Sequence, residues 1–208
     1  MSSLRLFLVR HGQTPANVLH KLDSRPPGPP LTAEGRRQAE ILAEALATEP
    51  VTAVYASVAT RAQQTAAPVA ERHGLAVQVV EGIHETQVGD LEGRNDDESI
   101  MAFRGVVDIW LGGDLTASAP NGETGQQVVD RFTAAVASIV EAHSDGVVVL
   151  VSHGAAIRLM AVHLLGGRHD VLAGHPYLPN TGRVVLDADP TAPHGWRFVE
   201  WMGIEVEG

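Results

Sequence analysis

Four short, mostly apolar runs constrain the fold of this chain more than any other feature. They lie at 4–9, 51–57, 75–80 and 147–152, and the last of them, VVVLVS, is the most apolar stretch of the chain. A strand that is apolar on both faces must be covered on both faces, as in a parallel sheet. Helical patterns lie between these runs, which is how parallel strands are connected. The sequence therefore predicts an α/β fold, a mainly parallel sheet with helices on both faces.

Capping residues mark the ends of the expected helices, because a side-chain oxygen or a glycine can complete the backbone hydrogen bonding there. Thr32 can begin the first helix and Gly74 can close the second, while Thr124 and Gln127 form a capping-box pattern. The expected helices cover about 32–48, 60–74, 124–139 and 155–165, and two further strands cover 183–187 and 196–201.

Two segments depart from the alternation of strands and helices. Residues 15–31 are rich in proline and are expected to form a loop. Residues 93–123 are expected to be irregular, with an amphipathic patch around IMAFRGVVDIWL, and to form a lid or insertion. The length of 208 residues suits one domain, so we expect a single domain over 1–208 that carries this lid.

Charge and cysteine content exclude several classes of function. The chain has 15 basic and 25 acidic residues, a formal net charge of −10, which should repel nucleic acids and anionic membranes. An anionic partner must therefore be a small molecule held in a local basic pocket. The absence of cysteine excludes the cysteine phosphatases.

The sequence also gives expectations about metal sites, cellular location and oligomeric state. The ten histidines show no zinc-like helical spacing with a carboxylate, so we expect no metal and no other cofactor. The first apolar run is too short for a signal peptide or a membrane span, which predicts a cytoplasmic protein with no membrane partner. A homo-oligomer is compatible with the sequence, but no pattern in it sets the oligomeric state.

Polar residues follow three of the apolar runs directly. Because the carboxyl ends of parallel strands meet at one edge of a sheet, we expect these residues to converge on one crevice. They are Arg10, His11 and Gly12 after the first run, Ser57 and Arg61 after the second, and His153 and Gly154 after the fourth.

These residue types suit the transfer of a phosphoryl group. Arginine forks bind phosphate oxygens in pairs and stay charged at any working pH. One histidine can attack phosphorus through a neutral nitrogen, and a second can stabilise the charge of the transition state. Gly12 and Gly154 would let the backbone approach the anion closely. The departing alcohol also needs a proton, and four carboxyl groups after the third strand could supply it: Glu81, Glu85, Asp90 and Glu92.

Successive motifs of this chain resemble those of the histidine phosphatase superfamily, in the branch that includes the cofactor-dependent phosphoglycerate mutases. LVRHGQT resembles the nucleophile motif of that family. PLTAEGRRQA, SVATRAQQTA, ETQVGDLEG, NGET and VSHGAAIR resemble its further motifs, in the same order. The likeness runs from about residue 4 to 186. Val58 departs from it, because the family usually has proline at that position.

The resemblance implies a role for each residue that it covers. His11 would be the phosphorylated nucleophile, and Glu85 the proton donor and later the base that activates water. Asn17 would contribute to the phosphate pocket. The phosphoryl group would be held by Arg10, Arg61 and His153. The family uses no metal.

A phosphomonoesterase that acts on a small phosphorylated metabolite through a phosphohistidine is therefore the expected function. A phosphoglycerate-type mutase would use the same residues, and a non-catalytic module that binds phosphorylated ligands is the alternative of another class. The selectivity for substrate would depend on 15–31 and 93–123. Weaker candidates for the pocket are Arg94, His20, His84 and His175.

Overall fold

The computed structural model describes residues 4–168, 178–192 and 194–202. Six strands form its sheet: β1 (Arg5–Arg10), β2 (Val51–Ser57), β3 (Val77–Val80), β4 (Val147–Ser152), β5 (Arg183–Ala188) and β6 (Trp196–Met202). The helices are α1 (Pro15–Val18), α2 (Ala33–Ala45), α3 (Thr60–Arg72), α4 (Asp97–Leu111), α5 (Gly125–Glu141) and α6 (Gly154–Leu164), and a 3₁₀ turn covers Gly89–Leu91.

The sheet has the order β3-β2-β4-β1-β5-β6. The first four strands in this order run parallel to one another, and they fall largely within the four mostly apolar runs of the sequence. β5 is antiparallel to β1, and β6 is antiparallel to β5. The predicted α/β class with a mainly parallel sheet is confirmed.

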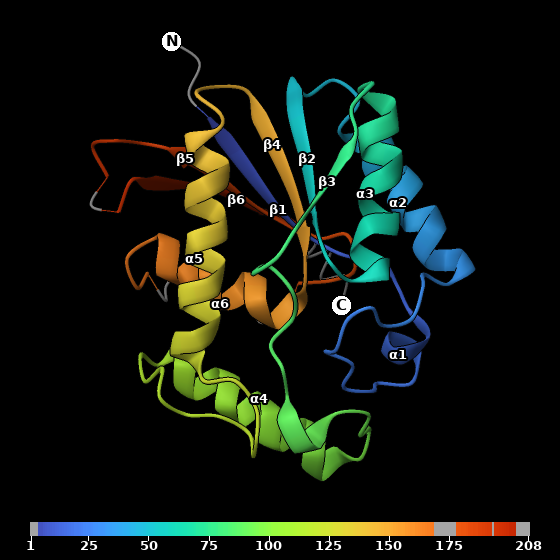
Figure 1. Cartoon of the computed structure of the whole chain (residues 1–208), viewed down its shortest axis with the longest axis vertical. Helices are drawn as coiled ribbons and strands as arrows, with labels where there is room; N and C mark the ends of the chain where they lie inside the picture. The colour runs from blue at the N-terminus through green and yellow to red at the C-terminus, as the bar shows by residue number, and fades with distance from the viewer. Residues whose placement is uncertain (1–3, 169–177, 193, 203–208) are drawn as a thin grey trace, which may run out of the picture.

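Helices cover both faces of the sheet (Figure 1), and the alternation of side chains along each strand explains why. Leu6 and Leu8 of β1 belong to a core shared with α5 and α6. Phe7 and Val9, which point the other way, belong to a second core with α2 and α3. Both faces of β1 are therefore buried, which accounts for its mostly apolar run.

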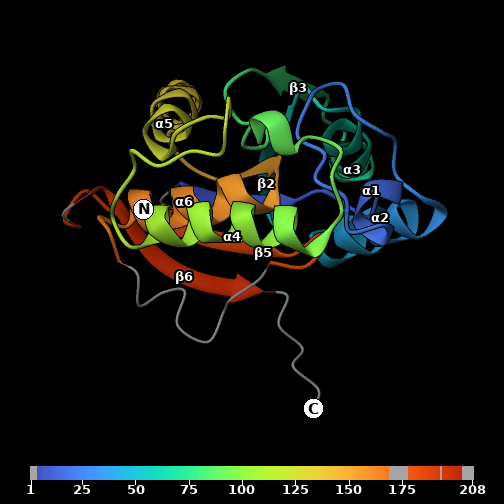
Figure 2. The same cartoon turned by 90° about the horizontal axis from the view of Figure 1, so that it is seen from below.

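The segment 93–123 differs from the prediction, because its first half is the fifteen-residue helix α4 rather than irregular chain. Asp96 caps this helix by accepting a hydrogen bond from the Ser99 backbone N–H at 3.0 Å. Trp110 is buried, and its indole N–H donates to the Ala117 carbonyl at 2.8 Å. Asp97 and Glu98 are exposed in the first turn of α4, where acidic side chains are favourable. In Figure 1 α4 lies below the lower end of the sheet, and in Figure 2, which is seen from below, it crosses in front of the sheet.

The segment 15–31 is largely the predicted loop. The exception is the short helix α1. Thr14 and Asn17 form a capping box at its N-terminus, in which each side chain is hydrogen-bonded to the backbone N–H of the other residue. The loop is tied to the chain near residue 93 by the Leu22 backbone N–H, which donates to the Arg94 carbonyl at 2.8 Å. No helix within the described residues is long and apolar enough to cross a membrane.

Candidate active site

The carboxyl ends of β1 and β4 bring two histidines together. The strands are parallel neighbours, with Arg10 opposite Ser152, so the residues that follow them are side by side. The His11 backbone N–H donates to the Ser152 carbonyl at 3.0 Å. The imidazole rings of His11 and His153 lie 5.1 Å apart between centroids. The convergence predicted from the strand ends is thus present in the structure.

Hydrogen bonds define the protonation of His11. Its Nδ1 lies 2.7 Å from the Gly12 carbonyl, which can only accept, so Nδ1 carries the proton. Its Nε2 accepts a hydrogen bond from Nε of Arg61 at 3.2 Å. Burial, followed by the charges of Arg61 and Arg10, lowers the pKa of His11 well below its usual value. His11 is therefore a neutral imidazole whose Nε2 lone pair points into the site.

His153 lies behind His11 and is fully buried. Its Nε2 is hydrogen-bonded to the Ser57 hydroxyl at 2.7 Å, and its Nδ1 has no hydrogen-bond partner within the described residues. Burial and the charge of Arg61 also lower the pKa of this histidine. The ring is therefore neutral in the unliganded protein, and it does not itself line the cavity beside His11.

Two buried guanidinium groups complete the basic cluster. Arg10 donates from one terminal nitrogen to the Leu178 carbonyl at 2.7 Å. Arg61 extends from the first turn of α3, where it donates to the Asp23 carbonyl at 3.1 Å and lies 3.6 Å from the carboxylate of the same residue. Burial raises the pKa of Asp23, and the charge of Arg61 opposes that rise. Asp23 thus holds Arg61 where a phosphate would meet it.

The two glycines have different roles. A Cβ on Gly154 would lie 3.3 Å from Nε of Arg10, so this glycine makes room for the guanidinium group at the cavity wall. A Cβ on Gly12 would lie 2.6 Å from the Gly35 carbonyl of α2. Gly12 is therefore constrained by close packing against that helix, and it does not line the cavity. Its carbonyl fixes the tautomer of His11.

Glu85 lies at the N-terminus of α6. Its carboxylate accepts hydrogen bonds from the backbone N–H groups of Ala155 at 3.3 Å and Ala156 at 3.1 Å. Glu85 thereby occupies the first free N–H groups of this helix. Of the four carboxyl groups considered, only Glu85 lines the cavity as far as the described residues show.

Asn17 lines the cavity from α1. Its side-chain oxygen accepts hydrogen bonds from the Thr14 backbone N–H at 3.0 Å and from the Asn180 amide at 3.2 Å. These two bonds orient the Asn17 amide so that its NH₂ group is the part left to contact a ligand.

The site opens into a cavity of about 570 Å³. Arg10, His11 and Arg61 lie on its wall together with Glu85 and Asn17. This combination of two guanidinium groups, a neutral imidazole and a carboxyl group suits the binding of a tetrahedral anion and an attack on its centre. Among the described residues, no group of three or more potential ligands could hold a metal ion.

A family model described as the histidine phosphatase superfamily (branch 1) matches residues 6–202. The chain belongs to this family. The resemblance inferred from the motifs is thereby confirmed.

Three known proteins are similar to the chain over most of its length. The PE-PGRS family protein PE_PGRS11 of Mycobacterium tuberculosis is 34% identical over 98% of this chain, which spans only 37% of that relative. The probable phosphoglycerate mutase GpmB of Klebsiella pneumoniae is 32% identical, with 78% of this chain and 75% of the relative covered. The solved mycobacterial glucosyl-3-phosphoglycerate phosphatase superposes with a TM-score of 0.80 at 28% identity, over 97% of this chain and 99% of that one.

Two features of this histidine phosphatase site were not predicted from the sequence. One is Asp23 beside Arg61, within a loop whose conformation the prolines left undefined. The other is an ion pair between Arg131 of α5 and Glu123, at 2.8 Å. Arg131 also donates to the carbonyls of Gly82, His84 and Glu85, at 2.6, 2.9 and 3.2 Å. No local pattern signals this contact, because its partners are 46 to 49 positions apart in the sequence.

The four weaker candidates for the pocket differ in whether they line the cavity. His20 lines the cavity, whereas His84 does not, and His175 lies outside the described residues. Arg94 is exposed and paired with Asp96 at 2.8 Å, so it belongs to the protein surface.

Proposed function

We propose that the protein is a metal-independent phosphomonoesterase that hydrolyses a small phosphorylated metabolite through a phosphohistidine on His11. One observation carries this proposal: the Nε2 lone pair of a neutral, buried imidazole faces the cavity between two guanidinium groups. The family and the phosphatase among the solved relatives support it. The proposal treats 1–208 as one domain, with α4 and its flanking segments over the site.

In the first half of the reaction, Nε2 of His11 attacks phosphorus as the bond to the alcohol oxygen breaks. Arg10 and Arg61 pair with the non-bridging oxygens, and the unpartnered nitrogen of His153 stabilises the same charge. A phosphate oxygen takes over the N–H that Arg61 now donates to His11, which releases the lone pair for attack. Glu85, protonated, gives its proton to the departing alcohol.

In the second half, the carboxylate of Glu85 removes a proton from water, which attacks the phosphohistidine and releases inorganic phosphate. His11 returns to its neutral form with Nδ1–H on the Gly12 carbonyl. Asn17 adds a hydrogen bond to the phosphoryl group from its amide.

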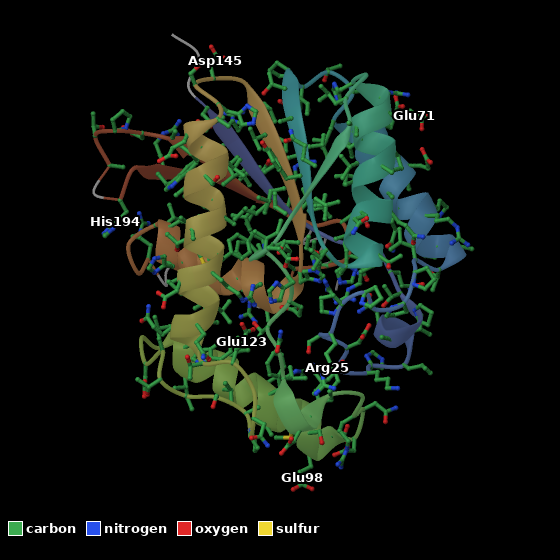
Figure 3. All side chains as sticks on the ribbon, viewed as in Figure 1. Arg25, Glu71, Glu98, Glu123, Asp145 and His194 are labelled. Carbon is green, nitrogen blue, oxygen red and sulfur yellow. The ribbon has the colours of Figure 1, made fainter. Side chains whose placement is uncertain are left out.

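The proposal is tested with p-nitrophenyl phosphate in the presence of EDTA. We expect turnover by the native protein, and a loss of roughly 10³-fold or more in kcat for His11→Asn. Acid quenching during turnover should trap an acid-labile phosphoryl adduct, detected by mass spectrometry on the peptide that contains residue 11. His194→Asn is the matched control, because this exposed histidine lies at the far side of the molecule (Figure 3). Activity that survives in His11→Asn, or an adduct elsewhere, would contradict the proposal.

A mutase is the second candidate, because one relative carries that name and the same residues would serve. A mutase must retain its bisphosphorylated intermediate instead of passing the phosphoryl group to water. Incubation with 3-phosphoglycerate and a trace of 2,3-bisphosphoglycerate distinguishes phosphatase activity from mutase activity. We expect release of inorganic phosphate; interconversion of phosphoglycerates without such release would favour the mutase.

The cellular setting that we propose is the cytoplasm, because ionised phosphomonoesters do not cross lipid bilayers and are retained there. The formal net charge of −10 supports a small anionic substrate and argues against nucleic-acid or membrane partners.

A further inference from the structure

The proline-rich segment supplies no group to the proposed reaction, yet it lies against the helix that carries one of the two guanidinium groups. We call residues 23–31 the proline loop; in Figure 1 the chain between α1 and α2 passes below the end of α3. The backbone N–H of Thr60, the first residue of α3, donates to the Pro27 carbonyl at 2.8 Å. The Leu31 backbone N–H donates to the side-chain oxygen of Gln64 at 2.8 Å. The proline loop is thereby fixed to the start of α3 at two points.

Within the proline loop, Gly28 is the residue that meets the guanidinium group of Arg61. Its φ is +65°, in the left-handed region that glycine adopts without strain. A Cβ at this position would lie 2.3 Å from Nη1 of Arg61, about 1 Å short of an ordinary van der Waals contact. The absence of a side chain at Gly28 therefore leaves the space that the guanidinium group occupies.

Contacts on its other sides already hold the Arg61 guanidinium group. Its Nε donates to Nε2 of His11 at 3.2 Å, and its Nη2 donates to the Asp23 carbonyl at 3.1 Å. Nη1 lies 3.6 Å from the Asp23 carboxylate and has no hydrogen-bond partner within the described residues. The side chain is only 2% exposed. An atom that displaced Nη1 would therefore disturb the contact with His11 or the contacts with Asp23.

The position of this guanidinium group matters because its fork must match phosphate oxygens in a fixed geometry. A side chain that is held in place before the substrate binds also loses less rotamer freedom on binding. A misplacement of about 1 Å can lower the rate of a reaction roughly 100-fold, even when its cause lies away from the reacting atoms. Gly28 does not line the cavity, so it can act on a substrate only through Arg61.

We propose that Gly28 is a positioning residue, whose missing side chain lets the proline loop close against Arg61 and hold its guanidinium group beside Nε2 of His11. This inference rests on the proposed phosphomonoesterase activity and gives the proline loop a role in it. Any side chain at position 28 moves Arg61 and weakens each step that uses it, although residue 28 touches no substrate.

The first test compares two glycine substitutions that cause the same backbone strain. Gly28→Ala should lower kcat/KM for p-nitrophenyl phosphate roughly 10- to 100-fold. Gly74→Ala is the matched control, because Gly74 also has a φ of +65°, but a Cβ there would meet no atom within 4 Å. It should lower stability to a similar extent and leave kcat/KM unchanged. Circular dichroism establishes that both variants are folded.

A double-mutant cycle tests whether the effect passes through Arg61. In the Arg61→Ala background the guanidinium group is gone, so Gly28→Ala should change kcat/KM no more than Gly74→Ala does. NMR provides a measurement that needs no turnover. In ¹⁵N-labelled protein without added ligand, Gly28→Ala should shift the Nε–H resonance of Arg61, and Gly74→Ala should leave it in place.

The outcomes separate the two proposals. If the native protein hydrolyses no phosphomonoester, the activity is wrong, and the Arg61 resonance alone decides whether Gly28 positions this side chain. If the native protein is active but Gly28→Ala and Gly74→Ala lower kcat/KM equally, the activity stands and the positioning role is overturned. An effect of Gly28→Ala that is as large in the Arg61→Ala background, or an unchanged Arg61 resonance, would also overturn it.

Discussion

His11 shows how a single residue can be specified by contacts on all sides. The Gly12 carbonyl holds the proton on Nδ1, and Arg61 faces the lone pair on Nε2. The carbonyl is in place because Gly12 packs closely against Gly35 of α2. The orientation of the proposed nucleophile therefore depends on a helix that contributes nothing else to the chemistry.

The lowered pKa values of His11 and His153 predict how stability depends on pH. The unfolded chain binds a proton at each histidine near pH 6.5 and the native protein does not, so stability falls as pH decreases through that value. Between pH 7.5 and 5.5 each residue should account for at most about 1.4 kcal/mol of lost unfolding free energy, the limit in which the native imidazole binds no proton. Urea denaturation of the native protein, His11→Asn and His153→Asn at both pH values measures this.

Each variant should lose less stability on acidification than the native protein does. Met101→Ala provides the control, because this exposed side chain does not titrate and the variant should keep the full dependence on pH. The assignment of neutral imidazoles would be wrong if all four proteins lost the same free energy.

Among the elements, the loop after β3 depends on α5 for its position. Arg131 binds three carbonyls of 82–85, and Glu123 accepts hydrogen bonds from both Arg131 and the Gln87 backbone N–H. The ion pair therefore fixes the backbone that carries Glu85, without contacting a substrate. Arg131 is a positioning residue.

If Arg131 no longer positions Glu85, kcat should fall most for substrates whose leaving group must be protonated. Arg131→Gln should lower kcat roughly 10- to 100-fold for alkyl phosphates, and much less for p-nitrophenyl phosphate, whose leaving group departs unprotonated. Plots of log kcat against leaving-group pKa for the native protein and the variant measure the difference in slope. Arg94→Gln, which breaks a surface pair, is the control, and a uniform loss across all esters would indicate a purely structural effect.

The sequence alone predicted those elements whose pattern is contained within a few neighbouring residues. The mostly apolar runs predicted β1 to β4, and the polar residues behind them predicted which side chains converge. α4 was missed because Gly105 and its β-branched neighbours weaken the helical pattern, while the buried Trp110 stabilises the helix through tertiary contacts. Asp23 and Arg131 could not have been predicted, because each acts on residues far away in the sequence.

At the scale of the whole molecule, the site concentrates positive charge within a protein of net negative charge. Arg10 and Arg61 are both buried, and each helps to lower the pKa of His11. Such a cluster reduces the stability of the unliganded fold, and an anion that binds it restores part of that stability.

Inorganic phosphate should therefore raise the melting temperature. At 100 times its Kd the gain is about 2.7 kcal/mol, which for a chain of this length corresponds to roughly 5–10 °C. Differential scanning fluorimetry in phosphate and in sodium chloride of equal ionic strength measures the shift. Arg61→Gln should remove the phosphate-specific part. An equal shift in the variant would mean that phosphate acts through the solvent and not at this site.

The contact between Arg131, Glu123 and the backbone of 82–85 also has a consequence for how such a protein can evolve. It joins the chain just before the excursion that contains α4 to the chain just after it, so the excursion is closed at its base. Residues 86–122 can then be lengthened, shortened or exchanged while Glu85, the proposed proton donor, keeps its position relative to His11, the proposed nucleophile. New specificities can arise in this segment without a new catalytic apparatus.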